Sequence, residues 1–356
     1  MGLGAIVVLG GELEAISSTA PRPATLEFAL AEPLECVEVM GRSMLDRMVE
    51  RFSRAGVKEV SILTTAEIAC MMGNFSTTLA DLKVHVVTDM RSSLAQKLGE
   101  YAQSGIEHAF VVSGSLYTET DLLDLFYFHR EARQPATRAC ERQVPLDLWV
   151  VDCAEAQGMA SDHLLRQSSR VAYYIREYVN CLTHARDLRR LVSDVLRGRC
   201  AMRPPGKEVR PGVWIEATAD IHRRARIVAP AYIGSGSEIR EDTLITRCSN
   251  VERGCYIDYG TVIEDSSVLA NTHVGIWLDL CHSVASANKL FNLEKNVILD
   301  ISDPSIMRAR SSVRETHRNF DMSFGLQPMA FELESRRQQK TPTQKTWQFG
   351  ANPVQG

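Results

Sequence analysis

The sequence predicts an α/β protein in which a doubly wound domain is followed by a left-handed parallel β-helix. Strand and helix patterns alternate over residues 1–200, whereas aliphatic residues recur at every sixth position over residues 209–269. These two patterns favour an α/β domain at 1–200, a linker at 201–208 containing Pro-Pro-Gly, and a β-helix with an irregular cap at 209–302. Residues 303–356 are expected to form a tail that is mobile or docked on another surface.

The first domain is predicted from short apolar runs that are separated by amphipathic segments. Strands are expected at 5–9, 60–63, 84–87 and 109–112, and helices at 43–52, 94–101 and 121–133. Strands that alternate with helices form a mostly parallel sheet. Ligands of such sheets bind beyond the carboxyl ends of the strands, so these ends are the expected position of a site.

The second domain is predicted from its repeat. Its period of six residues differs from the 3.6 residues of a helix and the 2 residues of a strand. Each six-residue unit fits a short strand followed by a turn, and three such units close one triangular coil. The aliphatic residue fills the coil interior, and a small residue four positions later fits the corner. The aliphatic series is Val209, Ile215, Ile221, Ile227, Ile233, Ile239, Ile245, Val251, Ile257, Ile263 and Leu269, and the second series runs from Val213 to His273. We expect Ile215 to Leu269 to face inward.

The composition argues against a nucleic-acid-binding, membrane-spanning or secreted protein. The net charge of -4 provides no general attraction to nucleic acid or to an anionic membrane. No apolar run reaches the ~18–20 residues of a membrane span, and the apolar N-terminus lacks the basic start of a signal peptide. The nine cysteines form no Cys-x-x-Cys pair, which favours reduced thiols in a cytoplasmic protein over a zinc or redox site.

Several local motifs resemble those of one enzyme family. They are Gly41-Arg42-Ser43-Met44-Leu45, then Gly56 to Val60, then Phe110 to Leu122, then Phe128 to Glu131. In this order they resemble sugar-1-phosphate nucleotidyltransferases, also called NDP-sugar pyrophosphorylases. Members that act on glucose-1-phosphate or mannose-1-phosphate commonly carry a C-terminal hexapeptide β-helix, so the resemblance covers residues 1 to about 300.

The resemblance implies attack of a sugar-1-phosphate on a nucleoside triphosphate, and this chemistry needs cations and a metal held by carboxylates. Of the family's glycine-rich loop this chain keeps Gly10-Gly11, whereas the later glycine and the triphosphate-binding Arg are absent, and Glu12 and Glu14 stand where the resemblance brings the phosphates. These carboxylates repel a triphosphate. Arg22 lies further downstream, and the family's next Lys is missing, since no Lys precedes residue 58.

The two metal-binding aspartates of the family are also replaced. Ser115 stands where the resemblance places the first aspartate, and Asn180 stands where it places the second. Neither side chain carries a charge, so no residue is predicted to hold a metal. Asp89, Glu119 and Asp121 are the carboxylates that could take over this role, although acids near a helix start also favour the helix dipole.

These departures predict a protein that has kept the fold and lost catalysis, with a binding or regulatory role in nucleotide-sugar or polysaccharide metabolism. No catalytic residue is assigned. Gly10, Gly11, Ser115 and Asn180 are the relict positions of a nucleotide-sugar site, and Mg²⁺ is a cofactor only if the protein is an active transferase with a divergent site. A second alternative is acyl transfer on His222, His273 or His282. The expected partner is a second copy or an active paralogue, with neither nucleic acid nor membrane bound.

Overall fold

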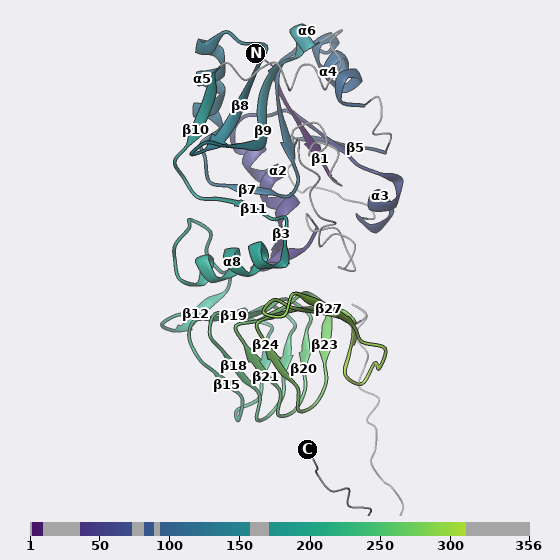
Figure 1. Ribbon diagram of the computed structural model, residues 1–356, viewed down its shortest axis with the longest axis vertical. Coiled ribbons are helices and arrows are strands. Elements are labelled where there is room, and N and C mark those ends of the chain that lie inside the picture. The colour runs from purple at the N-terminus through teal and green to yellow at the C-terminus, as the bar shows by residue number, and fades with distance from the viewer. Residues whose placement is uncertain (1, 10–35, 73–81, 89–92, 157–170, 311–356) are drawn as a thin grey trace, which may run out of the picture. The chain divides into compact units, whose positions relative to one another are not determined.

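The computed structural model describes residues 2–9, 36–72, 82–88, 93–156 and 171–310 (Figure 1). All of them belong to one compact unit, Met1–Val313. Within it, an N-terminal domain with a largely parallel sheet is followed by a region of short, mostly parallel strands. Among the described residues, no helix has the length and apolar character needed to cross a membrane.

The N-terminal sheet has the strand order β10-β8-β9-β6-β1-β4-β5. Strands β5, β4, β1 and β6 are parallel, and β9 runs antiparallel to both β6 and β8. Strands β4 and β5 lie on one side of β1, and the next strand, β6, lies on its other side. The direction in which strands are added to the sheet therefore reverses between β1 and β6. The strands are β1 (Gly2–Val8), β4 (Glu59–Leu63), β5 (Lys83–Val87), β6 (Ile106–Ser113), β8 (Ala136–Glu141), β9 (Val144–Asp152) and β10 (Ala172–Ile175).

Helices cover both faces of this sheet. One core contains buried residues of α2 and α5, and the core on the opposite face contains buried residues of α4 and α6. The strands and helices predicted in this domain are confirmed, with ends that differ by a few residues, whereas β8, β9 and β10 were not predicted. The helices are α2 (Met44–Arg54), α3 (Ala66–Met72), α4 (Ser93–Gln103), α5 (Leu122–Ala132), α6 (Cys153–Ala156) and α8 (Ala185–Leu196).

Local sequence explains where α2 begins and ends. The Ser43 hydroxyl accepts a hydrogen bond from the backbone N–H of Asp46, which caps the helix. Leu45, Val49 and Phe52 are buried, and their spacing places them on one helix face. Shortly after the helix, Gly56 has a φ of +81°, a conformation that glycine adopts without a steric penalty.

The strand-rich part of the chain, which we call the coiled region (207–310), visits three sheets in turn. Strands of one sheet follow each other along the chain at intervals of 17 or 18 residues and are mostly parallel, as in Ile233 opposite Val251. This arrangement is compatible with the expected β-helix. The eight-stranded sheet contains β12 (Lys207–Arg210), β13 (Val213–Ile215), β16 (Ala231–Ile233), β19 (Ser249–Val251), β22 (Ser267–Val268), β25 (Ser283–Ser286), β26 (Lys289–Asn292) and β27 (Val297–Asp300).

The other two sheets of the coiled region are shorter. The five-stranded sheet contains β14 (Asp220–Ile221), β17 (Glu238–Ile239), β20 (Tyr256–Ile257), β23 (Thr272–Val274) and β28 (Met307–Ala309). The four-stranded sheet contains β15 (Arg226–Ile227), β18 (Leu244–Thr246), β21 (Val262–Glu264) and β24 (Asp279–Cys281). One apolar core joins all three sheets, and most of the predicted aliphatic series from Ile227 to Ile263 is buried in it.

The six-residue period fails at both ends of the predicted series. Val209 lies on the terminal strand β12 and is 45% exposed. After Ile263 the next residue of the core is Val268 and not Leu269, because Val251 lies opposite Val268. The corner between them is one residue shorter than the earlier ones. Leu269 is therefore buried in a different cluster, against the N-terminal domain.

The coiled region extends beyond its predicted limits. At its start, Lys207 and Glu208 of the predicted linker already belong to β12, which pairs antiparallel with β13. At its end, β26 and β27 form an antiparallel hairpin on the eight-stranded sheet. Part of the predicted tail adds a strand as well, because β28 pairs antiparallel with β23. The rest of that tail, from residue 311, lies outside the described residues.

Candidate functional site

The predicted nucleotide site lies at the carboxyl ends of β1 and β6, where the strand order reverses. Leu9 donates its backbone N–H to the carbonyl of Leu63 at 2.9 Å, and Gly114 donates to the carbonyl of Val8 at 2.9 Å. These bonds fix the edge of the sheet on which a ligand of an α/β domain binds. Gly10, Gly11, Glu12, Glu14, Arg22 and Asp89 lie outside the described residues.

Ser115 lies two residues after the end of β6, in a turn, and is buried. Its hydroxyl lies 3.0 Å from the hydroxyl of Ser113, and its carbonyl accepts the backbone N–H of Leu182 at 2.8 Å. The bond from Leu182 to Ser115 joins the segment after β11 to the segment after β6. It continues the antiparallel pairing of β7 (Leu116–Thr118) with β11 (Val179–Cys181). Ser115 is thus part of a hydrogen-bonded turn.

Asn180 lies on β11 opposite Tyr117, on the strand pair that follows the turn at Ser115. Its amide nitrogen donates to the carbonyl of Asp187 at 3.0 Å, which ties β11 to α8. Its side chain is almost fully buried, and its Oδ1 accepts no hydrogen bond among the described residues. The fold therefore brings Asn180, on β11, beside the strand that begins directly after Ser115.

Two of the carboxylates that could replace the missing aspartates have other partners. Glu119 accepts the hydroxyl of Tyr117 at 2.9 Å and the backbone N–H groups of Ala201 and Met202 at 2.6 and 3.2 Å. Asp121 caps α5 by accepting the N–H of Leu123 at 2.9 Å. The sequence predicts that both acids lie at a helix start. Asp121 does cap α5, whereas Glu119 instead holds the segment between the two domains.

The donor chemistry at these positions does not fit a magnesium ion. Mg²⁺ is usually held by one or two carboxylates, whereas Ser115 and Asn180 offer a hydroxyl already bonded to Ser113 and a neutral amide oxygen. Among the described residues, no group of three or more His, Cys, Asp or Glu side chains is arranged to hold a metal.

A buried carboxylate lies between the N-terminal domain and the coiled region. Glu252 is fully buried and accepts the backbone N–H groups of Met40 and Gly41, each at 2.9 Å, and the amide of Asn250 at 2.7 Å. Burial raises the pKa of Glu252 to about 7, although these three donors lower it. Beside it, Arg253 pairs with Glu38 at 2.6 Å.

The turn that meets Glu252 belongs to one of the motifs that carry the family resemblance. It joins β2 (Glu38–Val39) to β3 (Arg42–Ser43), and both Met40 and Gly41 have positive φ angles, 53° and 73°. A Cβ on Gly41 would lie 3.0 Å from both Glu216 Oε1 and the Tyr232 hydroxyl. Glycine therefore allows the turn to approach the coiled region closely enough for both N–H groups to reach the carboxylate.

A second contact between the domains comes from α8. Arg189 is 6% exposed and donates to Asp265 at 2.8 Å, Ser267 at 2.9 Å and the carbonyl of Cys248 at 3.1 Å. Burial lowers the pKa of this guanidinium, and Asp265 opposes that shift. Asp265 has a positive φ of 42° and lies in the shortened corner that moves the register from Ile263 to Val268.

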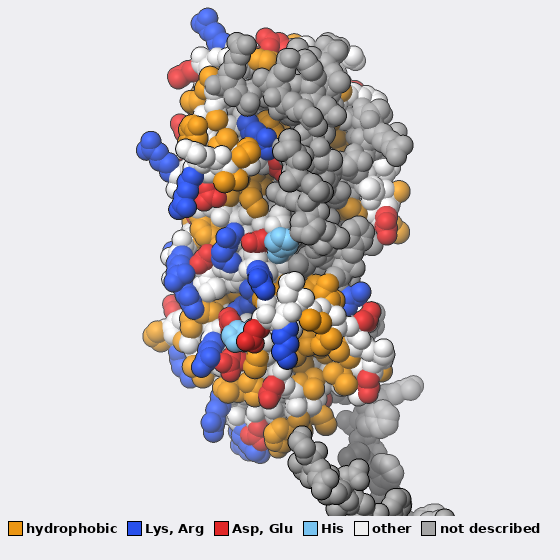
Figure 2. All heavy atoms as spheres, in the orientation of Figure 1, with side chains coloured by type: hydrophobic (Ala, Val, Ile, Leu, Met, Phe, Trp, Pro, Cys, Tyr) orange, Lys and Arg blue, Asp and Glu red, His pale blue; other side chains and the backbone are white. Residues whose placement is uncertain are grey.

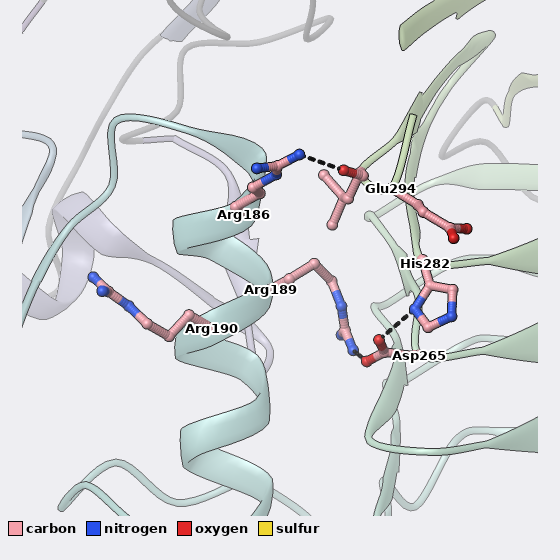
Figure 3. Close-up of a pocket in the computed structure, with 7 residues that line it drawn as sticks. Arg186, Arg189, Arg190, Asp265, His282 and Glu294 are labelled. Carbon is pink, nitrogen blue, oxygen red and sulfur yellow. Dashed lines mark hydrogen bonds and ion pairs between the residues drawn. The ribbon is translucent and has the colours of Figure 1, made fainter. Parts of the chain in front are cut away.

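A cavity of about 490 Å³ opens beside this contact (Figure 3). Asp265 accepts a hydrogen bond from His282 Nδ1 at 2.7 Å, so the same carboxylate holds both Arg189 and the imidazole. Arg186 donates to the carbonyl of Leu293 at 2.7 Å, whereas Arg190 points to the other side of α8. The arginines of the cavity wall therefore do not converge on one point.

The three histidines considered for acyl transfer have different surroundings. His282 has the orienting carboxylate that a general base needs. His222 accepts the backbone N–H of Arg224 at 3.3 Å, within an exposed corner. The repeat predicts an inward position for His273, and this is wrong, because the register change places Thr272 there. It is 9% exposed and stacks on Tyr256, with ring centroids 5.2 Å apart and planes at 11°.

Sequence reasoning missed the residues of this domain contact. Glu252, Asn250 and Arg189 carry no motif, and nothing in a single sequence shows that a charged residue inside a repeat will be buried by another domain. A comparison of the chain with models of known protein families finds no match. A search of curated proteins finds no significant relative.

Proposed function

We propose that the chain is a sugar nucleotidyltransferase-like protein with a left-handed β-helix, which has lost pyrophosphorylase activity and acts by binding or regulation. The motifs from Gly41 to Glu131 and the hexapeptide repeat support the family, and the strand order supports a ligand site beside β1 and β6. We place the protein in the cytoplasm, as part of nucleotide-sugar metabolism, in a homo-oligomer or with an active paralogue.

One observation carries the proposed loss of activity. At the end of β6 and on β11, where the resemblance places two metal-binding aspartates, stand a serine and an asparagine whose side chains bond to Ser113 and to the backbone of α8. Loss of one metal carboxylate removes several kcal/mol of transition-state stabilisation, and each ~1.4 kcal/mol is tenfold in rate. A nucleotide sugar can still bind through contacts to its base and its sugar, without a metal.

The test is pyrophosphate release by the full chain with a panel of nucleoside triphosphates and sugar-1-phosphates in magnesium. We expect no release above the protein-free background, while an active nucleotidyltransferase in the same buffer serves as the positive control. Calorimetric titration with nucleotide sugars then measures the proposed binding. Turnover of about one per second with any pair, an ordinary enzymatic rate, would establish the active alternative with a divergent site.

Acyl transfer remains the second candidate, because Asp265 orients His282 beside a cavity. The matched assay is acetyl-CoA turnover by the wild type and by His282→Asn. Turnover that this substitution abolishes would favour the acyltransferase, whereas no turnover in either protein leaves the binding role as the better account.

A further inference from the structure

The two terminal strands of the eight-stranded sheet differ in composition. At one edge β12 has the sequence Lys-Glu-Val-Arg, and at the other edge β27 has the sequence Val-Ile-Leu-Asp. All residues of both strands are exposed. Charged side chains, lysine above all, protect an edge strand against pairing with another chain. The β12 edge is protected in this way, whereas the β27 edge is not.

Strand β27 exposes aliphatic side chains on both of its faces. Val297, Ile298 and Leu299 are 44%, 54% and 44% exposed, and successive residues of a strand point to opposite sides. Figure 2 shows hydrophobic side chains gathered on the part of the surface where Figure 1 places β27. One edge of β27 pairs with β26, and no strand in the described part of the chain pairs with the other.

Opposite charges stand at the two ends of this strand. Lys295 lies just before β27 and is exposed, and among the described residues it has no ion-pair partner. Asp300, the last residue of β27, is 66% exposed and lies 3.8 Å from Lys289. The neighbouring Glu294 lines the cavity beside α8. When two copies of β27 pair antiparallel, the Lys295 end of each meets the Asp300 end of the other.

We infer that β27 is the interface at which two copies of this chain associate, by antiparallel pairing of the two strands about a twofold axis. The surface is self-complementary, as a twofold interface requires. Pairing satisfies the backbone groups of the edge, covers three aliphatic residues in each copy, and sets two Lys295–Asp300 pairs at its ends. The inference is independent of the proposed loss of catalysis, because strand pairing needs neither nucleotide nor metal.

The first experiment measures the mass of the full chain by light scattering across micromolar concentrations. We expect the wild type to approach twice the chain mass of 39.7 kDa, and Ile298→Lys to remain a monomer, because it places a charge in the strand pair. The matched control is Val209→Lys, an exposed valine on the opposite terminal strand β12. It should associate as the wild type does, and circular dichroism checks that both variants are folded.

The second experiment tests the charge arrangement. Lys295→Glu puts like charges at both ends of the pair and should weaken association about tenfold, the effect of two exposed ion pairs. Lys295→Glu with Asp300→Lys exchanges the charges and should recover most of that loss. A monomeric wild type would overturn the inference. So would a dimer that Ile298→Lys leaves intact, or one that Val209→Lys dissociates equally.

Discussion

The carboxyl ends of β1 and β6 and the contact between the two domains use polar residues in opposite ways. At the strand ends, the positions that the family resemblance assigns to carboxylates carry a hydroxyl and an amide. At the domain contact, a fully buried carboxylate, Glu252, and a buried guanidinium, Arg189, are surrounded by hydrogen-bond partners. A catalytic metal site would show the reverse distribution, with charge kept where the reaction takes place.

This difference has a physical reason. Burial of a charged side chain costs several kcal/mol in lost hydration. This cost is offset only where the fold supplies well-placed hydrogen-bond partners for the charged group. The β2–β3 turn presents two N–H groups to Glu252, and the shortened corner presents Asp265 to Arg189. The molecule thus retains its buried charges where they fix the arrangement of two domains. The following variants measure that distinction.

The largest effect is expected from Arg189→Ala. The substitution removes the guanidinium that donates to Ser267, to the Cys248 carbonyl and to Asp265. The free energy of unfolding should fall by about 2–4 kcal/mol, less than for a fully buried pair, since Asp265 is 43% exposed. Urea denaturation measures this loss.

The control for that variant is the next residue of α8. Arg190 is 56% exposed and pairs with Asp187 at 3.5 Å, so Arg190→Ala should change stability by less than about 1 kcal/mol. Equal losses in the two variants would show that the contact with the coiled region contributes no more than an ordinary surface pair.

Glu252 should make stability depend on pH. Its pKa is about 7 in the folded protein and 4.5 without burial, so the folded protein binds the proton more tightly. This contribution to stability is complete below pH 4.5 and is lost as pH rises through 7, with an upper limit of about 3 kcal/mol. Relative to Glu252→Gln, which cannot ionise, the wild type should become less stable from pH 5 to pH 8. A constant difference between the two proteins over that range would contradict the raised pKa.

On β11, Asn180→Asp tests one of the two positions that the resemblance assigns to metal-binding aspartates. A carboxylate cannot donate to the carbonyl of Asp187, as the amide does at 3.0 Å. Loss of that donor in a buried position should lower the free energy of unfolding by about 1–3 kcal/mol, and ionisation of the carboxyl at neutral pH adds the hydration cost of its charge. The loss should shrink at acid pH, where the protonated carboxyl can donate. A thermal shift produced by magnesium in this variant, and absent in the wild type, would mean that one carboxylate suffices to rebuild a metal site.

The sequence by itself determined four strands and three helices up to α5, though not α3 or the short strands β2, β3 and β7, and it determined the inward series from Ile227 to Ile263. These features depend on local periodicity, which places a residue on one face of a strand or helix whatever the rest of the chain does. Strands β8, β9 and β10 escaped prediction, and so did α8, whose buried surface packs partly against the coiled region.

Only the tertiary structure decided where the period shifts and where the buried charges lie. Ile263 to Val268 is one residue short of the repeat, and Leu269 satisfies a strict count equally well, so the correct register emerges only when each coil is paired with the one before it. The burial of Glu252 and Arg189 likewise depends on groups distant in the chain, the turn at Met40 and the corner at Asp265. Periodicity records which face of its own element a residue occupies, whereas burial of a charge depends on what another element brings to that face.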